Sequence, residues 1–439
     1  MSLRSLRIWA GTGLLVMNVA ACAAGNNNPS STGTDNAGGA GGAGSGGGGG
    51  GTGGSGTGGG GSGGGGGSPG AELPPLPLRS EGRWILDATG ARFKIAAVNW
   101  YGAEEMDYVP AGLELADIRD IARQIREHGF NTVRLPWSNE MVALDPVVAD
   151  KVVSANPSLQ GKTALQVFDA VIDALAYEGL VVILDNHVSD ADWCCSEMDG
   201  NGLWYTAKYP EATWLQHWRT LAKRYAGQPA VVAADLRNEP RPALGVTPVW
   251  GGGDLATDWH SAATRGGNAV LEENPNLLIV VEGLNYGSDL AGPYTLPITL
   301  AVPNRLVYSA HDYAWFHSGV TDYQQLKTEL GAKWGYIIAQ GKPYTAPVLL
   351  GEFGTCHTAD TCVTDATGQG FWFSGIRTYL GEGDMDWAYW SINGTQARGT
   401  TRVFGAEETY GILDVTWKKP ASESLLSSLK SLQKATSGP

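Results

Sequence analysis

The sequence has few basic residues, few cysteines and no long uninterrupted apolar run, and each shortage argues against a class of protein. Its 30 Lys and Arg residues are outnumbered by 44 Asp and Glu residues, which gives a formal net charge of -14. Nucleic-acid binding needs clustered Lys and Arg to neutralise phosphates, so the absence of any basic run argues against a nucleic-acid partner. The one apolar stretch near the start is too short, and too interrupted by glycine, to predict a membrane span.

Glycine, in contrast, is abundant and unevenly distributed. The chain has 63 glycines, and they are concentrated between residues 25 and 70 among Ser, Thr, Asn and Ala. Such a composition cannot bury enough apolar surface to fold, so it predicts a flexible coil. We therefore divide the chain into a leader, residues 1–22, a Gly/Ser-rich linker, residues 23–79, and a folded domain, residues 80–439. The size of that domain suits one large barrel.

The leader has the features of an export signal, because two arginines precede a short apolar run and small residues follow it. Its end, Val19-Ala20-Ala21-Cys22, resembles the lipobox of bacterial lipoproteins, in which cleavage before the cysteine leaves that residue to be lipidated. The alternative is an ordinary signal peptide cut near Ala21. We expect an exported protein that lipidated Cys22 anchors to the cell surface or outer membrane, or otherwise a secreted one.

Without Cys22, four cysteines remain in an apparently exported chain, and an even number predicts disulfides. We favour a disulfide between Cys356 and Cys362, which closes a short loop. This pairing leaves Cys194 and Cys195 to form a vicinal disulfide. Long-range cross-pairing is the alternative. A zinc site that uses these cysteines with His357 fits no structural zinc spacing and does not suit an oxidising compartment, so we expect no metal.

Short apolar segments of strand length alternate with longer amphipathic segments through the folded domain. Two of the amphipathic segments end at Gly129 and Gly227, where a helix-capping glycine is expected. Strict alternation of strand and helix implies parallel strands joined by right-handed crossovers. The pattern predicts an α/β protein with a (β/α)8 TIM barrel. The eight predicted strands begin near residues 93, 132, 180, 231, 277, 306, 347 and 386.

Polar or aromatic residues follow most of these segments at the end where TIM barrels place their active sites. Two of them are glutamates, Glu239 and Glu352, which are far apart in sequence but meet across the rim if they follow the fourth and seventh strands. Two carboxylates beside a cation, a tyrosine, histidines and an aromatic ring are the parts needed for glycosidic bond hydrolysis. The other residues in this set are Arg134, Asp185, Asn186, His187, Asn238, His311, Tyr313 and Trp390.

Each of these residues also has a purely structural interpretation. A lone glutamate after a strand is usually solvated, and Arg134 could be one member of a structural ion pair. His187 and His311 could be buried, satisfied histidines, and Trp390 could belong to the core. Two glutamates that occur together with the other polar groups favour the catalytic interpretation.

In combination, the motifs around these residues resemble glycoside hydrolase family 5, the cellulase family, of the endo-β-1,4-glucanase type. The resemblance extends from about Ser80 to the C-terminus, and it implies Glu239 as the general acid/base and Glu352 as the nucleophile. The motifs occur in the family's order: VNWYG, RLPWS, DNH, DLRNEP, SAHDY, LLGEFG and WSIN.

The resemblance also implies which residues bind the substrate. Asn238 matches the residue that contacts the sugar 2-OH, Trp390 matches the platform under the sugar at the cleavage point, and Trp100 and Trp250 match more distal sugar-stacking residues. The remaining matches are Arg134 and Tyr313, as partners of the nucleophile, and the active-site histidines His187 and His311.

The chemistry implied is a retaining double displacement, in which one carboxylate attacks and the other donates a proton. We expect Arg134 and Tyr313 to keep Glu352 ionised. Neither a cofactor nor a metal is required, the expected partner is a polysaccharide or oligosaccharide, and we expect a monomer.

One segment departs from the family's pattern. The insert DADWCCSEMDGNGLWY, residues 190–205, is longer than the corresponding loop of many cellulases, which puts the substrate identity in doubt. A β-mannanase, xyloglucanase or other β-glycosidase of the same family is the main alternative to a cellulase. A non-catalytic surface barrel that binds carbohydrate is the further alternative.

Overall fold

A computed structural model of the chain describes residues 70–439, which form one compact unit. The predicted signal peptide, the lipidation site at Cys22 and the linker as far as residue 69 lie outside the described residues. Residues 70–78 belong to the folded unit. The Ala71 amide donates to the Tyr177 carbonyl over 3.0 Å, and Leu78 is 1% exposed. Residues 70–79, which the sequence analysis assigned to the linker, therefore pack as part of the folded unit.

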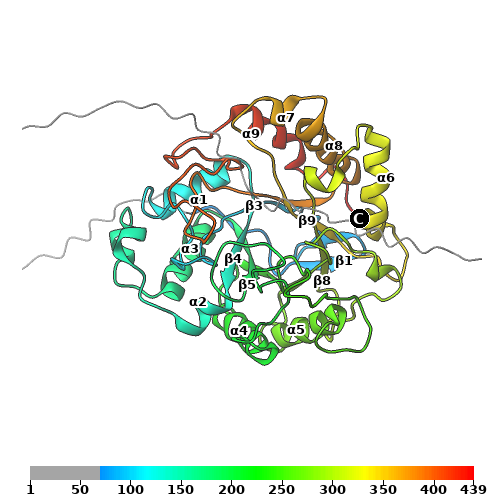
Figure 1. Ribbon diagram of the computed structural model, residues 1–439, viewed down its shortest axis with the longest axis horizontal. Helices are drawn as coiled ribbons and strands as arrows, with labels where there is room; N and C mark the ends of the chain where they lie inside the picture. The colour runs from blue at the N-terminus through cyan, green and yellow to red at the C-terminus, as the bar shows by residue number, and fades with distance from the viewer. Residues whose placement is uncertain (1–69) are drawn as a thin grey trace, which may run out of the picture. The chain divides into compact units, whose positions relative to one another are not determined.

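Eight parallel strands close into a barrel, with helices at its periphery (Figure 1). Strands that follow one another in the chain pair side by side, and the last pairs with the first, with Trp387 opposite Ala96. Each strand coincides with a segment predicted from the sequence, so the (β/α)8 TIM barrel is confirmed. The strands are β3 (Ala96–Asn99), β4 (Thr132–Ser138), β5 (Val181–Val188), β6 (Val231–Asp235), β7 (Leu278–Glu282), β8 (Leu306–His311), β9 (Val348–Phe353) and β10 (Asp386–Tyr389).

Alternate positions along each strand face the barrel interior and the surrounding helices, because successive side chains of a strand point to opposite faces. Ile183 and Leu349 lie in a buried apolar cluster inside the barrel. Their neighbours Leu184 and Leu350 belong to the larger cluster beneath the helices. This alternation explains why the strands appear in the sequence as nearly continuous apolar runs.

A short antiparallel hairpin, which the sequence analysis missed, packs against the amino end of the barrel. It consists of β1 (Arg79–Glu81) and β2 (Trp84–Leu86). Leu78 and Ile85 are buried in the same cluster as the interior strand residues. The amino end of the barrel is therefore filled with apolar side chains and leaves the opposite end for the site.

Several helices begin at ordinary capping residues. Asp117 caps α1 (Ile118–Glu127), and Thr163 forms a capping box with Gln166 at the start of α3 (Ala164–Tyr177). Among residues 70–439, no helix combines the length and the apolar character that a membrane span requires. The other helices are α2 (Asn139–Leu144), α4 (Glu211–Arg224), α5 (Trp259–Glu273), α6 (Tyr323–Lys333), α7 (Thr361–Thr364), α8 (Gly368–Gly383) and α9 (Glu423–Leu429).

Candidate active site

The carboxyl ends of the strands bring the predicted catalytic residues together. Arg134, His187, His311 and Glu352 lie on β4, β5, β8 and β9, and Glu239 lies in the segment after β6. One oxygen of Glu239, one oxygen of Glu352 and a ring nitrogen of His311 lie within 4.8 Å of one another. The two carboxylates therefore share one small space, as the barrel topology predicted.

Arg134 connects the groups around this space. Its side chain is fully buried, and its Nη1 donates to Glu352 Oε1 over 2.8 Å. Its Nε donates to Asp235 over 2.9 Å, and its Nη2 donates to Glu282 over 2.9 Å and to Asn238 Oδ1 over 3.0 Å. A guanidinium carries its donors in one rigid plane, so Arg134 fixes the relative positions of its acceptors.

Both carboxylate oxygens of Glu352 have partners. Oε1 accepts from Arg134, and Oε2 accepts from the Tyr313 hydroxyl over 3.1 Å. Burial nevertheless raises the pKa of Glu352 above its ordinary value, even though His311 and Arg134 act to lower it. We expected the cation and the hydroxyl to dominate, and in this structure burial outweighs them. A carboxyl group must lose its proton before it can attack as a nucleophile, so the raised pKa of Glu352 works against that predicted role at low pH.

Glu239 is held by its backbone and by its side chain. Its φ of +48° is in the left-handed region, which is uncommon for a residue other than glycine. Its amide donates to Glu282 Oε2 over 2.7 Å, and its Oε1 lies 3.0 Å from His311 Nδ1. The contacts on both sides hold the carboxyl towards the shared space, where 8% of the residue stays exposed.

Glu282, at the end of β7, is a site residue that the sequence analysis missed. It is fully buried and lies 3.3 Å from His311 Nε2, in addition to its contacts with Arg134 and the Glu239 amide. Burial would raise the pKa of Glu282, but His311 and Arg134 lower it to about 2. The signal was present in the sequence, because the predicted strand LLIVVEG ends in a carboxylate just as its neighbours end in polar groups.

His311 lies between three carboxylates. Burial alone would lower its pKa, but Glu282 and Glu352, together with the hydrogen bond to Glu239, raise the pKa well above the usual range. The three carboxylates therefore favour the protonated form of His311, which carries a positive charge beside both predicted catalytic glutamates.

His187 and Asn238 line the neighbouring part of the site. His187 Nδ1 lies 2.6 Å from Asp185 Oδ2, and its Nε2 lies 3.4 Å from Asn238 Nδ2. Burial would lower the pKa of His187, but Asp185 raises it. Because Asn238 Oδ1 accepts from Arg134, the amide of Asn238 is oriented with its N–H groups towards His187.

Both disulfides favoured from the sequence are present, Cys194 with Cys195 and Cys356 with Cys362. The vicinal pair lies beside the site, because Cys194 Sγ is 3.6 Å from His187 Nε2.

Three groups of side chains in the described part of the chain have the spacing of a metal-ligand set, but each has another role. One combines Glu239 with the two sulfur atoms of the vicinal disulfide. Another is the set of Glu239, His311 and Glu352 described above. The third surrounds the Arg134 guanidinium and comprises Asp185, Asp235 and Glu282.

The predicted aromatic platforms are only partly found. Trp390 stacks on Tyr101, with ring centroids 5.1 Å apart, and is 7% exposed, so little of its face is open. The prediction that Trp100 stacks on distal sugars is wrong. Trp100 is fully buried, and its indole donates to the Ala111 carbonyl over 2.9 Å, because its side chain packs into the core from the strand end. Trp250 is half-buried and keeps some exposed surface.

The arrangement suits attack by one carboxylate while the other transfers a proton. Retaining glycosidases hold their two carboxyl groups about 5 to 5.5 Å apart, whereas inverting ones leave about 6.5 to 9.5 Å for a water molecule. The approach of Glu239 and Glu352 to within 4.8 Å is compatible with the retaining geometry.

Comparison with known proteins gives the same picture. The family profile described as cellulase (glycosyl hydrolase family 5) matches residues 86–396. An endoglucanase from Paenibacillus polymyxa is 33% identical over 371 residues, which cover 79% of this chain and 85% of the relative.

Two solved structures are also similar. The catalytic domain of the major endoglucanase from Xanthomonas campestris pv. campestris has a TM-score of 0.68 and 31% identity, over 81% of this chain and 99% of that one. The hyperthermophilic endocellulase from the archaeon Pyrococcus horikoshii has a TM-score of 0.69 and 27% identity, over 82% of this chain and 100% of that one.

Proposed function

Because this chain belongs to glycoside hydrolase family 5, the cellulase family, we propose that it cleaves internal β-1,4-glucosidic bonds of cellulose or related β-glucans. The observation that carries the proposal is the placement of Glu239 and Glu352 within 4.8 Å of each other, beside Arg134 and His311. The similarity to an endoglucanase of Paenibacillus polymyxa supports this substrate class.

In the proposed mechanism Glu352 attacks the anomeric carbon while Glu239 donates a proton to the leaving oxygen. The bond between the anomeric carbon and the leaving oxygen breaks as the glycosyl–Glu352 ester forms. Glu239, now ionised, takes a proton from a water molecule, and the resulting attack on the anomeric carbon breaks the ester and returns Glu352 as a carboxylate. The product keeps the anomeric configuration of the substrate.

The surrounding groups give the two glutamates different roles. Arg134 and Tyr313 each donate to an oxygen of Glu352, so they orient it for attack and stabilise its charge. Among residues 70–439, the one cationic group in contact with the Glu239 carboxylate is His311, whose Nδ1 lies 3.0 Å from Oε1. We propose that the Asn238 amide, which Arg134 orients, hydrogen-bonds the sugar 2-OH. His187 and Trp390, whose rings stack on each other, border the adjacent part of the sugar site.

Product analysis on a panel of β-1,4-glucans, β-mannans and small aryl glycosides tests the substrate class. The proposal expects a rapid fall in the viscosity of soluble β-1,4-glucan and short oligosaccharides of mixed length as products. Preferential cleavage of mannan would replace the cellulase assignment with the mannanase alternative. Binding of polysaccharide without any turnover would favour the non-catalytic barrel.

We also propose that the protein is exported and that lipidated Cys22 anchors it to a membrane surface. The support is the sequence Val19-Ala20-Ala21-Cys22 after an apolar leader, followed by a Gly/Ser-rich segment. Labelling of expressing cells with a fatty acid should mark the wild type and leave Cys22→Ala unmarked. Recovery of unlabelled, soluble wild type from the medium would contradict the anchor and favour simple secretion.

A further inference from the structure

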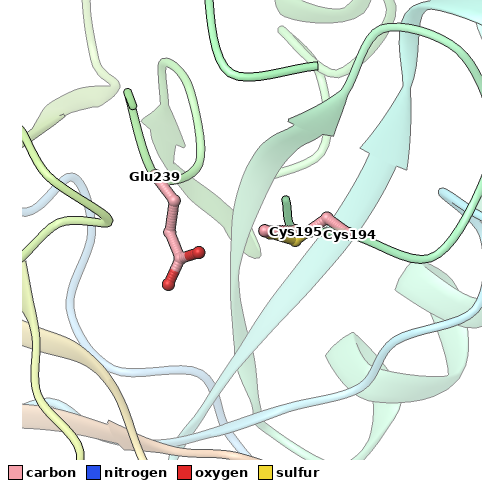
Figure 2. Close-up of side chains that lie close together, drawn as sticks. All are labelled: Cys194, Cys195 and Glu239. Carbon is pink, nitrogen blue, oxygen red and sulfur yellow. A yellow bond between two sulfur atoms is a disulfide. The ribbon is translucent and has the colours of Figure 1, made fainter. Parts of the chain in front are cut away.

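The vicinal disulfide lies within the catalytic centre. Figure 2 shows Cys194 and Cys195 beside Glu239. The two sulfur atoms and one carboxylate oxygen of Glu239 lie within 4.8 Å of one another, and Cys194 Sγ is 3.6 Å from His187 Nε2. By contrast, neither cysteine of the Cys356–Cys362 disulfide is within that range of Glu239 in a comparable group among the described residues.

Both sulfur atoms lie against the Asn238 amide. Asn238 Nδ2 is 3.7 Å from Cys194 Sγ and 3.8 Å from Cys195 Sγ, while Asn238 Oδ1 accepts from Arg134. The amide donates a weak hydrogen bond to each sulfur atom, because a disulfide sulfur is a poor acceptor, and a sugar hydroxyl can replace these bonds at little cost. The disulfide therefore restricts the orientation of the amide and leaves its hydrogens for substrate.

The loop that carries the disulfide is fixed to the same strand ends. The Asn201 side chain accepts from the Ser189 amide over 2.9 Å, and the Asn201 carbonyl accepts from Arg237 over 2.6 Å. Further along, Asp199 pairs with Arg241 over 2.7 Å. Arg237 and Arg241 flank Asn238 and Glu239 in sequence, so the loop and the catalytic segment are held as one assembly.

We propose that the Cys194–Cys195 disulfide is a positioning element of the catalytic centre, which holds the Asn238 amide and forms the wall of the subsite beside Glu239. The inference rests on the proposed hydrolase function and extends it to the insert that departs from the family's pattern. Opening the disulfide removes this wall. An added dithiol supplies two electrons and two protons, the S–S bond becomes two S–H groups, and the dithiol is oxidised to its own disulfide.

Two double variants separate this disulfide from the other one. Cys194→Ser/Cys195→Ser keeps only the 356–362 disulfide, and Cys356→Ser/Cys362→Ser keeps only the vicinal one. With a soluble β-1,4-glucan oligosaccharide, we expect the first variant to lose about tenfold to a hundredfold in kcat, the size of effect caused by a small misplacement of a catalytic group. We expect the matched control variant to keep the kcat of the wild type.

The reversibility of the effect gives a readout that a merely structural role would not produce. In Cys356→Ser/Cys362→Ser, native treatment with dithiothreitol should lower kcat by a similar factor, and re-oxidation with oxidised glutathione should restore it. Reduction should also change the pH profile of kcat/KM, because two thiols, which can ionise, replace an uncharged disulfide beside Glu239. Thiol alkylation and mass spectrometry should find both Cys194 and Cys195 alkylated in the treated protein.

The outcomes distinguish the inference from the proposed function. Wild-type kcat in Cys194→Ser/Cys195→Ser would overturn the positioning role while the hydrolase function stands. Full activity of reduced Cys356→Ser/Cys362→Ser, with both Cys194 and Cys195 alkylated, would also overturn the positioning role. If the wild type hydrolyses none of the β-glycans in the panel, the proposed function itself fails.

Discussion

The two ends of the barrel are built from the same strands but from opposite kinds of residue. Along β7, the inward positions are Leu278 and Val280, both about 1% exposed, and then Glu282, which is fully buried. On β5 the inward face likewise changes from Ile183 to the buried Asp185. Two positions along a strand therefore separate a packing residue from a buried charge.

The comparison shows what each end contributes. Apolar side chains at the amino end stabilise the barrel by burial. The charges of Asp185, Asp235, Glu282 and Glu352 at the carboxyl end are expensive to bury and are tolerated because each pairs with Arg134. Substitutions at the two ends should therefore separate activity from stability.

The largest expected effect is on activity at the carboxyl end. Glu352→Gln removes the proposed nucleophile but keeps the size and one acceptor of the side chain, so kcat should fall by several orders of magnitude on every substrate. Thermal unfolding should show a variant as stable as the wild type, or more stable, since burial raises the pKa of Glu352 and opposes its charge. Near-normal hydrolysis by this variant would remove the assignment.

Glu239→Ala should fail differently. Polysaccharide hydrolysis should fall almost as far, because its leaving group needs a proton, whereas an aryl glycoside with a good leaving group should still form the intermediate. Added azide should then raise the turnover of the aryl glycoside, by attacking the accumulated ester and yielding a β-glycosyl azide. Equal losses on both substrates, without azide rescue, would assign the proton donor to another residue.

Leu278→Ala is the matched change at the amino end of β7. It should lower the free energy of unfolding by about 2–5 kcal/mol, through lost burial and the cavity left behind. Its kcat should stay near the wild-type value below the new unfolding temperature. A large loss of kcat in the folded variant would show that the two ends are not separable.

Glu282→Gln, at the other end of the same strand, should have the smallest effect of these changes. We expect it to alter the dependence of kcat/KM on pH. Glu282 helps to raise the pKa of His311, so removing its charge lowers that pKa. Protonated His311 exists below its pKa and is lost as pH rises, so the alkaline limb of kcat/KM should move to lower pH. An alkaline limb that stays in place would show that His311 does not govern it.

The sequence predicted the barrel because each strand is a continuous apolar run with a polar end, and because helix and strand alternate strictly. It did not predict the β1–β2 hairpin, whose strands are too short to carry a pattern of their own. Trp100 was misplaced because an aromatic residue after a strand has the same sequence signature whether it faces the core or the solvent.

Within the site, Glu239 and Glu352 could be predicted because both stand at or just after a strand's carboxyl end in distinctive motifs. Glu282 was missed although it obeys the same rule at the end of β7. The position of Cys194 and Cys195 against Asn238 could not be predicted, because it depends on how the loop after β5 folds back and not on any local pattern. The direction of the Glu352 pKa could not be predicted either, because burial is a tertiary property.

The most direct test of the double-displacement mechanism is the anomeric configuration of the first product. Proton NMR can monitor this configuration while the wild type hydrolyses a β-1,4-glucan oligosaccharide. Because Glu239 and Glu352 are close enough for double displacement, we expect the β-anomer to appear first and the α-anomer to form only later, by mutarotation. Initial appearance of the α-anomer would mean direct attack by water and would contradict the assignment of Glu352 as the nucleophile.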